Sequence, residues 1–212
     1  MLVFIVIAVA AYLLGSIPTG YLVARARGID IRTVGSGNIG ATNAFRILGK
    51  PAGIFVLVAD GLKGFAASAW LADFVIQLFA VAPGRTEYLK IIAGICAVLG
   101  HNFTCWLKFK GGKGIATSAG VYFALAPQAA GIALGTWIVV FALGRYVSVA
   151  SIAAAVALPA AVWLTKNNLF LGIVTTALGL LAIYKHKSNI QRLVAGSERR
   201  LGQKSATPEE TK

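Results

Sequence analysis

Acidic residues are scarce in this chain of 212 amino acids, which has 7 Asp and Glu against 20 Lys and Arg. Charged residues of either sign make up 13% of the chain, about half the share of a typical soluble domain. The hydrophobic fraction is 58%, so too few polar side chains remain to cover the core that such a composition would build. Disorder, which needs low hydrophobicity, is excluded, and a soluble globular domain is disfavoured. The composition indicates an integral membrane protein with several spans.

Cysteine and histidine are rare, with two of each in the chain. Cys96 and Cys105 lie in one apolar stretch, where their separation corresponds to roughly 13 Å of rise on a helix, too long for a disulfide. No Cys/His spacing suits zinc, and we expect neither a metal nor a cofactor. The apolar run that follows Met1 has no basic segment before it and no small-residue cleavage site after it, so we expect a retained first span.

The apolar runs predict an all-α integral membrane protein with seven transmembrane helices, some of them short. The predicted spans are 2–24, 62–82, 89–106, two short helices within 115–143 hinged at Pro127, 148–165 and 169–184. We expect 51–60 to be a short interfacial piece and 83–90 to be a turn. Residues 1–195 then form one membrane domain, and residues 196–212 form a polar tail that we expect to be disordered.

Most basic residues fall in three stretches, 25–50, 107–114 and 185–212. Basic blocks mark the cytoplasmic side of a membrane protein, so we expect the N-terminus outside and the C-terminus in the cytoplasm. A count of five spans fits less well, because it places one basic block outside. Nucleic-acid binding, the other common interpretation of a basic chain, is disfavoured because apolar spans separate these short blocks.

Each basic stretch contains a polar motif beside the end of a span. In the first, residues 35–43 (GSGNIGATN), here called the serine loop, match G-x-G-x-x-G, and Asp60 stands 20 residues after Gly40. A dinucleotide site is rejected because that motif needs a preceding strand, and here a membrane span precedes it. Glycines before a helix still suit a phosphate cradle. The alternative is a tight interfacial turn with Asn and Thr as caps.

The second motif contains residues 108–114 (KFKGGKG), here called the lysine loop, and the third begins at Lys185-His186. The lysine loop is not a Walker motif, but glycines and three lysines beside a helix start suit an anionic ligand. Alternatively, these lysines bind no ligand and only mark the cytoplasmic side of the membrane. His101 and His186 are either site residues or satisfied interfacial side chains.

Charged residues within the apolar runs have their own interpretation. Asp60 and Lys63 can pair on one helical face and support the fold, and Asp73 lies near the outer end of its span. No histidine has an aspartate five residues after it, and no G-x-S-x-G is present. An acyl-transferring enzyme would therefore need an already activated donor.

The motifs together resemble one family. They are GSIPTGYLVAR (15–25), GSGNIGATNAFRILGK (35–50), DGLKG (60–64), GHNFTCWLKFKGGKGIAT (100–117) and KHKSNIQRLVAGSE (185–198). In this order they resemble the bacterial acyl-phosphate:glycerol-3-phosphate acyltransferases, the PlsY family, over nearly the whole chain to about residue 200. The resemblance implies seven spans in the bacterial cytoplasmic membrane, with the active site on the cytoplasmic face.

The resemblance also implies a reaction. An acyl group moves from acyl phosphate to the 1-hydroxyl of sn-glycerol 3-phosphate, giving 1-acylglycerol 3-phosphate (lysophosphatidate) and phosphate, in the first acylation step of phospholipid synthesis. Neither a metal nor a cofactor is implied. The implied partners are the two substrates, membrane lipid and a peripheral acyl-phosphate synthase; nucleic acid is not among them.

Site roles follow from the resemblance together with the chemistry of each residue. The residues expected to act in catalysis are Ser36, Asn38 and Thr42 on the donor phosphate and carbonyl, Arg46 on its charge, Asn189 on the attacking hydroxyl, and His101. The residues expected to bind substrate or brace the site are Gly37, Asn43, Lys50, Lys110, Gly112, Lys113, Ser148, His186 and Glu198. The base is His101, His186 or an oxygen of the donor phosphate. We favour the phosphate because the sequence shows no His–carboxylate pair.

Two other classes remain open. A transporter for an anionic metabolite would explain the spans and the cations, but it predicts polar residues near mid-membrane, whereas these cluster at one face. A structural or partner-binding membrane protein would leave the three polar motifs without a purpose. Neither class should accelerate phosphate release from palmitoyl phosphate.

Overall fold

The computed structural model describes residues 1–166 and 168–202, and this part of the chain contains helices and loops but no strand. The α-helices are α1 Leu2–Ser16, α2 Thr19–Arg25, α3 Ala41–Leu48, α4 Lys50–Ala66, α5 Ala72–Leu78, α6 Pro83–Asn102, α7 Ile115–Leu125, α8 Pro127–Gly144, α9 Val147–Thr165, α10 Leu169–Lys185 and α11 Lys187–Val194. A π-helical segment, η1 (Ala67–Leu71), joins α4 to α5, and a 3-10 turn, η2 (Cys105–Leu107), follows α6. The all-α prediction is confirmed.

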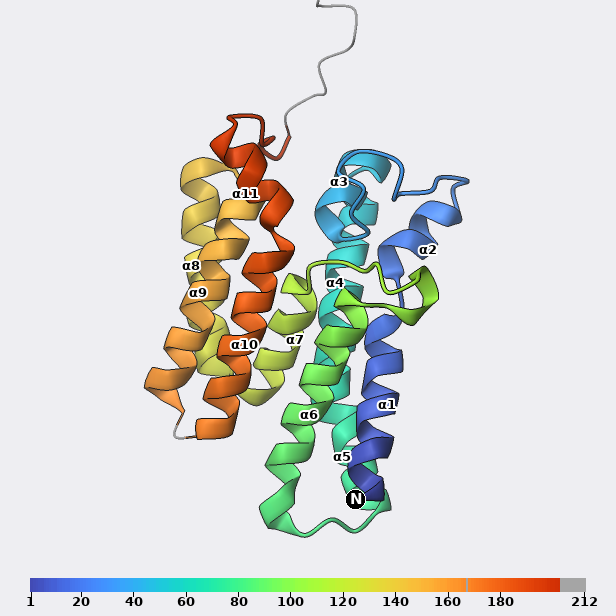
Figure 1. The fold of residues 1–212 in the computed structure, drawn as a ribbon, viewed down its shortest axis with the longest axis vertical. Coiled ribbons are helices and arrows are strands. Elements are labelled where there is room, and N and C mark those ends of the chain that lie inside the picture. Colours follow the sequence, from blue (N-terminus) through green and yellow to red (C-terminus); the bar gives the residue numbers. More distant parts are fainter. Residues whose placement is uncertain (167, 203–212) are drawn as a thin grey trace, which may run out of the picture.

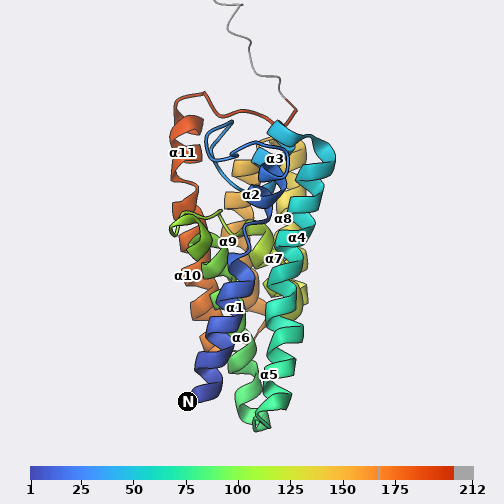
Figure 2. The same ribbon diagram turned by 90° about the vertical axis from the view of Figure 1, so that its right-hand side faces the viewer.

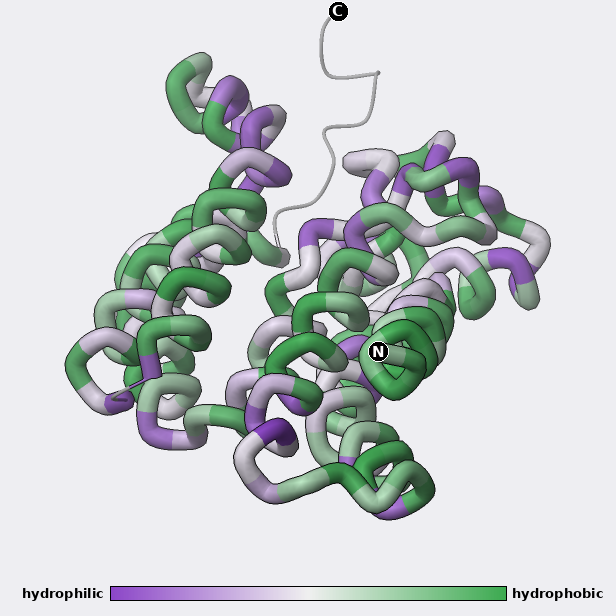
Figure 3. Tube along the Cα trace, turned by 60° about the horizontal axis from the view of Figure 1, so that its bottom comes forward, coloured by the Kyte–Doolittle hydropathy of each residue, from purple (hydrophilic) through white to green (hydrophobic). Residues whose placement is uncertain are grey.

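Five helical segments are long and apolar enough to cross a membrane, counted over the residues that the structure describes. They are Leu2–Arg25, Lys50–Leu78, Pro83–Leu107, Pro127–Gly144 and Val147–Thr165. The pair formed by α10 and α11, which meet at a bend of 52°, makes a sixth candidate, and α7 is a shorter apolar helix. Figure 3 shows hydrophobic colour along the helices and hydrophilic colour mainly in the connections. The chain is thus a multi-span membrane protein.

The prediction of an interfacial piece at 51–60 followed by a separate span at 62–82 is wrong. α4, η1 and α5 form one continuous helical segment from Lys50 to Leu78. The charges of Asp60 and Lys63 do not interrupt it, because the side chains form an ion pair of 2.8 Å inside the protein. A buried charge that is paired and hydrogen-bonded can remain within a helix.

Two further boundaries differ from the prediction. Residues 83–90 are not a turn, because α6 begins at Pro83, a residue whose fixed φ and missing N–H suit the first helical position. The predicted span 2–24 is divided at Ile17 and Pro18 into α1 and α2. Pro18 has no N–H to continue the α1 hydrogen-bond ladder.

The hinge within 115–143 is confirmed. α7 ends at Leu125, α8 begins at Pro127, and Ala126 between them has φ −147° and ψ 68°, outside the helical region. The predicted spans 148–165 and 169–184 correspond closely to α9 and α10. Breaks at proline and at short polar stretches therefore located these helices correctly.

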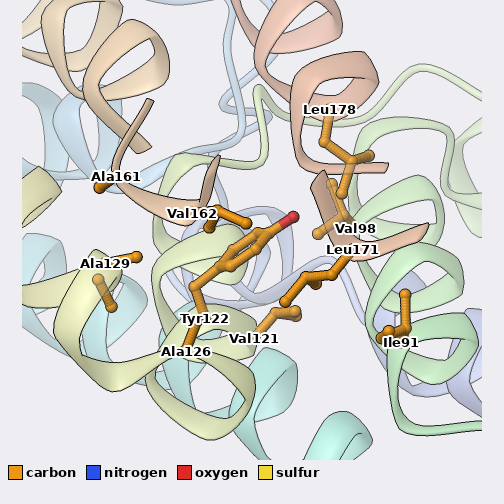
Figure 4. Packing of buried hydrophobic residues seen from close by; sticks show 11 residues of the cluster. Ile91, Val98, Val121, Tyr122, Ala126, Ala129, Ala161, Val162, Leu171 and Leu178 are labelled. Carbon is orange, nitrogen blue, oxygen red and sulfur yellow. The ribbon is translucent and has the colours of Figure 1, made fainter. Parts of the chain in front are cut away.

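The helices form two groups that meet at α7 (Figure 1). α1 packs along α6 and α4 along α7, while α8, α9 and α10 form the other group. Tyr122 of α7 is buried at the junction, and its hydroxyl donates to Thr175 Oγ1 of α10 at 2.7 Å. Figure 4 shows its ring among the apolar side chains of Val121, Val162 and Leu171.

Glycines allow α4 and α7 to touch through their backbones. A Cβ placed on Gly120 would lie 1.8 Å from the carbonyl oxygen of Gly61, and one on Gly64 would lie 2.1 Å from that of Thr117. Real Cβ atoms do not approach backbone oxygen so closely. Glycine at Gly120 and Gly64 is therefore required for this helix pair, as in other membrane proteins where small residues allow close packing.

The first and third polar motifs gather at one end of the molecule. α2, α3 and α11 lie at the end opposite the N-terminus in both Figure 1 and Figure 2. The helix bundle thus brings the serine loop and the third motif, far apart in sequence, to the same depth.

Candidate active site

A cavity of about 480 Å³ lies between the two groups of helices. Eleven of the predicted site residues line its polar end: Ser36, Asn38, Thr42, Asn43, Arg46, His101, Lys113, Ser148, His186, Asn189 and Glu198. The rest of the lining is largely apolar and includes Leu57, Leu134, Trp137, Leu158 and Leu178. One cavity therefore joins a cationic, hydrogen-bonding end to a hydrocarbon-like end.

Asn43 organises the serine loop. Its side-chain oxygen accepts from Ser36 N at 2.9 Å, and its Nδ2 donates to the carbonyl oxygens of Ile31 and Val34 at 3.2 and 3.1 Å. Asn38 Oδ1 accepts from Gly40 N at 2.8 Å, immediately before α3 begins. These bonds fix the loop over the cavity and leave the Ser36 hydroxyl without a partner among the described residues.

Glu198 is the centre of the polar end. Its Oε1 accepts from Ser148 Oγ and from Asn189 Nδ2, both at 2.7 Å, and its Oε2 accepts from Arg192 Nε at 2.7 Å. Glu198 is 8% exposed, so its carboxylate braces α9 against α11 from inside. Lys113 Nζ donates to Asn189 Oδ1, which links the lysine loop to the same network.

His186 lies between α10 and α11 and is buried. Its Nδ1 lies 2.7 Å from the carbonyl oxygen of Ala182. A carbonyl only accepts, so Nδ1 carries the proton and Nε2 remains for the cavity that His186 lines. This geometry suits hydrogen bonding to a substrate.

The two charged groups facing each other in this network have shifted pKa values. Burial raises the pKa of Glu198, but hydrogen bonds from Asn189, Ser148 and Arg192 outweigh it and hold the pKa below its usual value. Burial lowers the pKa of the Lys113 ammonium to about 8, although the Glu198 carboxylate opposes this shift. Lys113 is thus charged at neutral pH and loses its proton in mildly alkaline solution.

This shift predicts a pH-dependent affinity for a phosphate ligand. Below about pH 8 Lys113 is protonated and attracts the phosphate dianion, and above it the charge is lost. We expect the dissociation constant of a phosphate monoester to rise several-fold between about pH 7 and about pH 9.5, where the ligand's own charge is constant because its second pKa is about 6. Lys113→Arg keeps its charge throughout and should remove the rise; the same rise in this variant would contradict the role of Lys113.

The structure contains a His–carboxylate pair that the sequence did not reveal. His101 Nδ1 lies 3.6 Å from Asp60 Oδ1, and both side chains are buried and line the cavity. The sequence shows no such pair, which was the reason to favour the donor phosphate as base, and that reason does not hold in the structure. Asp60 is on α4 and His101 is at the end of α6, so no local spacing connects them.

Four predicted residues are absent from the described lining of this cavity: Gly37, Lys50, Lys110 and Gly112. Lys50 begins α4 and is exposed, as are Gly37 and Lys110 in their loops. Gly112 is buried directly against the His101 ring. Of the three lysines in the lysine loop, the structure directs only Lys113 to the cavity.

The segment after α11 also contributes to the site. Arg46 Nη2 donates to the carbonyl oxygen of Arg199 at 3.1 Å, Leu201 N donates to that of Arg145 at 3.0 Å, and Leu201 lines the cavity. A second, more polar cavity of about 590 Å³ shares Ser36, Phe45, Arg46 and Glu198 with the first. The predicted tail 196–212 therefore begins with residues that border the site, while 203–212 lie outside the described residues.

Comparison with known proteins agrees with this geometry. The family model described as glycerol-3-phosphate acyltransferase matches residues 5–196. The glycerol-3-phosphate acyltransferase of Geobacter metallireducens is 50% identical over 200 residues, covering 94% of this chain and 98% of the relative. That of Endomicrobium trichonymphae is 45% identical over 202 residues, covering 95% and 97%.

Two solved structures have the same fold. The glycerol 3-phosphate form of PlsY (YgiH), an integral membrane glycerol 3-phosphate acyltransferase, superposes with a TM-score of 0.84 at 38% identity, covering 94% of this chain and 96% of that one. Its lysophosphatidic acid form gives a TM-score of 0.80 at 37% identity. Fold, polar cavity and sequence agree, and the chain belongs to the PlsY family of integral membrane glycerol-3-phosphate acyltransferases.

Proposed function

We propose that this protein transfers a fatty acyl group from acyl phosphate to the 1-hydroxyl of sn-glycerol 3-phosphate, releasing 1-acylglycerol 3-phosphate and inorganic phosphate. The observation that carries the proposal is the cavity itself, in which Arg46 and Lys113 lie at one end and Leu134 and Leu158 at the other. Both substrates carry a phosphate, which the cations would bind, and the donor also carries a hydrocarbon chain, which the apolar end would hold. The relative solved with glycerol 3-phosphate and with lysophosphatidic acid supports both ends of this assignment.

The serine loop would hold the donor phosphate. The Ser36 hydroxyl, the Asn38 amide and the start of α3 border the cavity on one side. Lys113 and His186 border the same polar end from the lysine loop and from the start of α11, and would hold glycerol 3-phosphate. Asn189, already fixed by Glu198, would orient the attacking hydroxyl.

The chemistry needs no covalent enzyme intermediate. The glycerol oxygen forms a bond to the acyl carbon, the bond between that carbon and the phosphate oxygen breaks, and phosphate leaves with the electron pair. We assign the hydroxyl proton to an oxygen of the departing phosphate, because that oxygen arrives with the substrate and needs no base from the protein. The Nε2 of His186, which the Nδ1–H bond to Ala182 O leaves free to accept a proton, is the alternative. An acyl phosphate is a mixed anhydride, so its activation is supplied before it reaches the site.

The charge distribution supports a topology for this reaction. Seven spans would comprise the five long candidates, the bent pair of α10 and α11, and the shorter α7. With the N-terminus outside, the three basic stretches and the cavity's polar end face the cytoplasm, in the bacterial cytoplasmic membrane. A peripheral acyl-phosphate synthase would deliver the donor at that face.

A donor comparison tests the proposal. Purified protein in lipid vesicles is given labelled glycerol 3-phosphate with either palmitoyl phosphate or palmitoyl-CoA, in the presence of a chelator. We expect palmitoyl phosphate to give lysophosphatidate at a rate at least about a hundredfold above that from the thioester. Equal rates, or product from the thioester only, would reject the donor. Uptake of label into the vesicles without any product would instead indicate transport.

A further inference from the structure

We propose that His101 is a positioning residue, which fixes the lysine loop so that Lys113 reaches glycerol 3-phosphate. The inference deepens the proposed function and rests on the role of Lys113 given there. It assigns to His101 an effect through Gly112 rather than a proton transfer with substrate.

The end of α6 and the lysine loop are in direct contact. Gly112 N donates to the carbonyl oxygen of His101 at 3.0 Å, and Gly111 N donates to that of Asn102 at 3.2 Å. The Nε2 end of the imidazole lies against the loop, since a Cβ on Gly112 would come 2.2 Å from Nε2, 2.9 Å from Cε1 and 3.1 Å from Cδ2 of His101. Backbone and ring together therefore determine the path of the chain just before Lys113.

A buried ion pair lies beside the imidazole, whose Nδ1 has no hydrogen-bond partner among the described residues. Asp60 Oδ1 lies 3.6 Å from His101 Nδ1 and 2.8 Å from Lys63 Nζ. It also accepts from Thr19 Oγ1 at 3.2 Å, and Lys63 Nζ donates to the carbonyl oxygen of Ile17 at 2.8 Å. The side chains of the charged pair and the histidine are 4 to 6% exposed.

This cluster ties the loop to three rigid elements. Thr19 begins α2, just after Ile17 in the break that follows α1, while Asp60 and Lys63 belong to α4 and His101 to the end of α6. The flexible glycines of the lysine loop thus rest on a surface that the helices fix. Preorganised contacts of this kind matter because a displacement of about 1 Å can reduce a rate a hundredfold.

A double-mutant cycle tests the inference. Gly112→Ala should raise the KM for glycerol 3-phosphate about tenfold or more, with a smaller change in kcat, because the three atoms nearest to its methyl group belong to the His101 ring. His101→Ala should raise this KM as the loop loses its support. In the double variant the methyl group has room, so its KM should match that of His101→Ala within about threefold.

Gly111→Ala is the matched control. Its Cβ would meet backbone atoms, 2.0 Å from His101 O and 2.8 Å from the Asn102 carbonyl carbon, so removing the imidazole cannot relieve it. We expect Gly111→Ala to raise the KM for glycerol 3-phosphate by the same factor whether His101 is present or replaced by alanine. If Gly112→Ala does not accumulate in membranes, recovery of folded protein in the double variant supports the inference. Absence of the double variant, when His101→Ala alone folds, overturns it.

Two outcomes separate this inference from its rivals. If the effects of Gly112→Ala and His101→Ala multiply, the ring does not position the loop. If His101→Ala lowers kcat by a factor of 10² to 10⁴ and leaves KM unchanged, the imidazole is a general base and the inference is wrong. Failure of the underlying function is recognised independently, because Lys113→Ala would then leave the KM for glycerol 3-phosphate unchanged.

Discussion

Replacing Glu198 by alanine is expected to lower kcat/KM for acyl transfer about a hundredfold. The change removes the acceptor of Ser148 and Asn189 and the partner of Arg192. A buried polar group left without a partner costs about 1 to 3 kcal/mol, and here Ser148 and Asn189 are both buried. Asn189 would then no longer be held where it meets Lys113.

The same variant should shift the pH dependence. The Glu198 carboxylate raises the pKa of Lys113 against the effect of burial. Without it Lys113 loses its proton at lower pH, so the KM for glycerol 3-phosphate should begin to rise below about pH 8. Glu87→Ala, an exposed acidic position in α6, is the control and should change neither quantity. Full activity of Glu198→Ala would show that the carboxylate does not organise the site.

Replacing Gly120 by alanine is expected to reduce the free energy of unfolding by about 3 kcal/mol, near the upper end for an overpacked core. The added methyl group would lie 1.8 Å from Gly61 O, and both sides of this contact are backbone, so no side chain can turn away. α4 and α7 must then move apart. Asp60 on α4 thereby moves away from α7, the helix that follows the lysine loop. The thermal unfolding midpoint of the purified protein measures the effect.

Gly131→Ala provides the matched control. Gly131 is also helical, in α8, but nothing lies within 4 Å of its Cβ position. Alanine there should leave the midpoint unchanged or raise it slightly, because alanine favours helix by up to about 1 kcal/mol. Equal midpoints for the Gly120 and Gly131 variants would mean that α4 and α7 do not touch.

The sequence predicted helix breaks well where they depend on local chemistry. Pro127 ends one helix and begins another whatever surrounds it, and the structure has that hinge. The sequence predicted helix breaks poorly where tertiary contacts decide whether a helix continues. Asp60 and Lys63 suggested an interruption, yet their mutual ion pair and their contacts with Thr19 and Ile17 O allow the helix to continue.

The candidate site follows the same distinction. Positive-inside charge and glycine-rich motifs place Ser36, Lys113 and Asn189 at one membrane face, and the structure brings them to one cavity. The pairing of His101 with Asp60 joins residues 41 positions apart on two helices, and no pattern along the chain encodes that contact. Nor does the sequence distinguish Lys110, which is exposed, from Lys113.

The short length of α7 has a consequence for how substrates meet. Its 11 residues rise roughly 16 Å, about half of a hydrocarbon core of ~30 Å. In Figures 1 and 2 the chain between α6 and α7 accordingly lies well below α3 and α11. A lipid donor whose chain lies in the apolar end of the cavity need not leave its leaflet, so it would arrive by diffusion in two dimensions. The rate would then follow the mole fraction of donor among the lipids, while the water-soluble acceptor alone obeys ordinary bulk concentration.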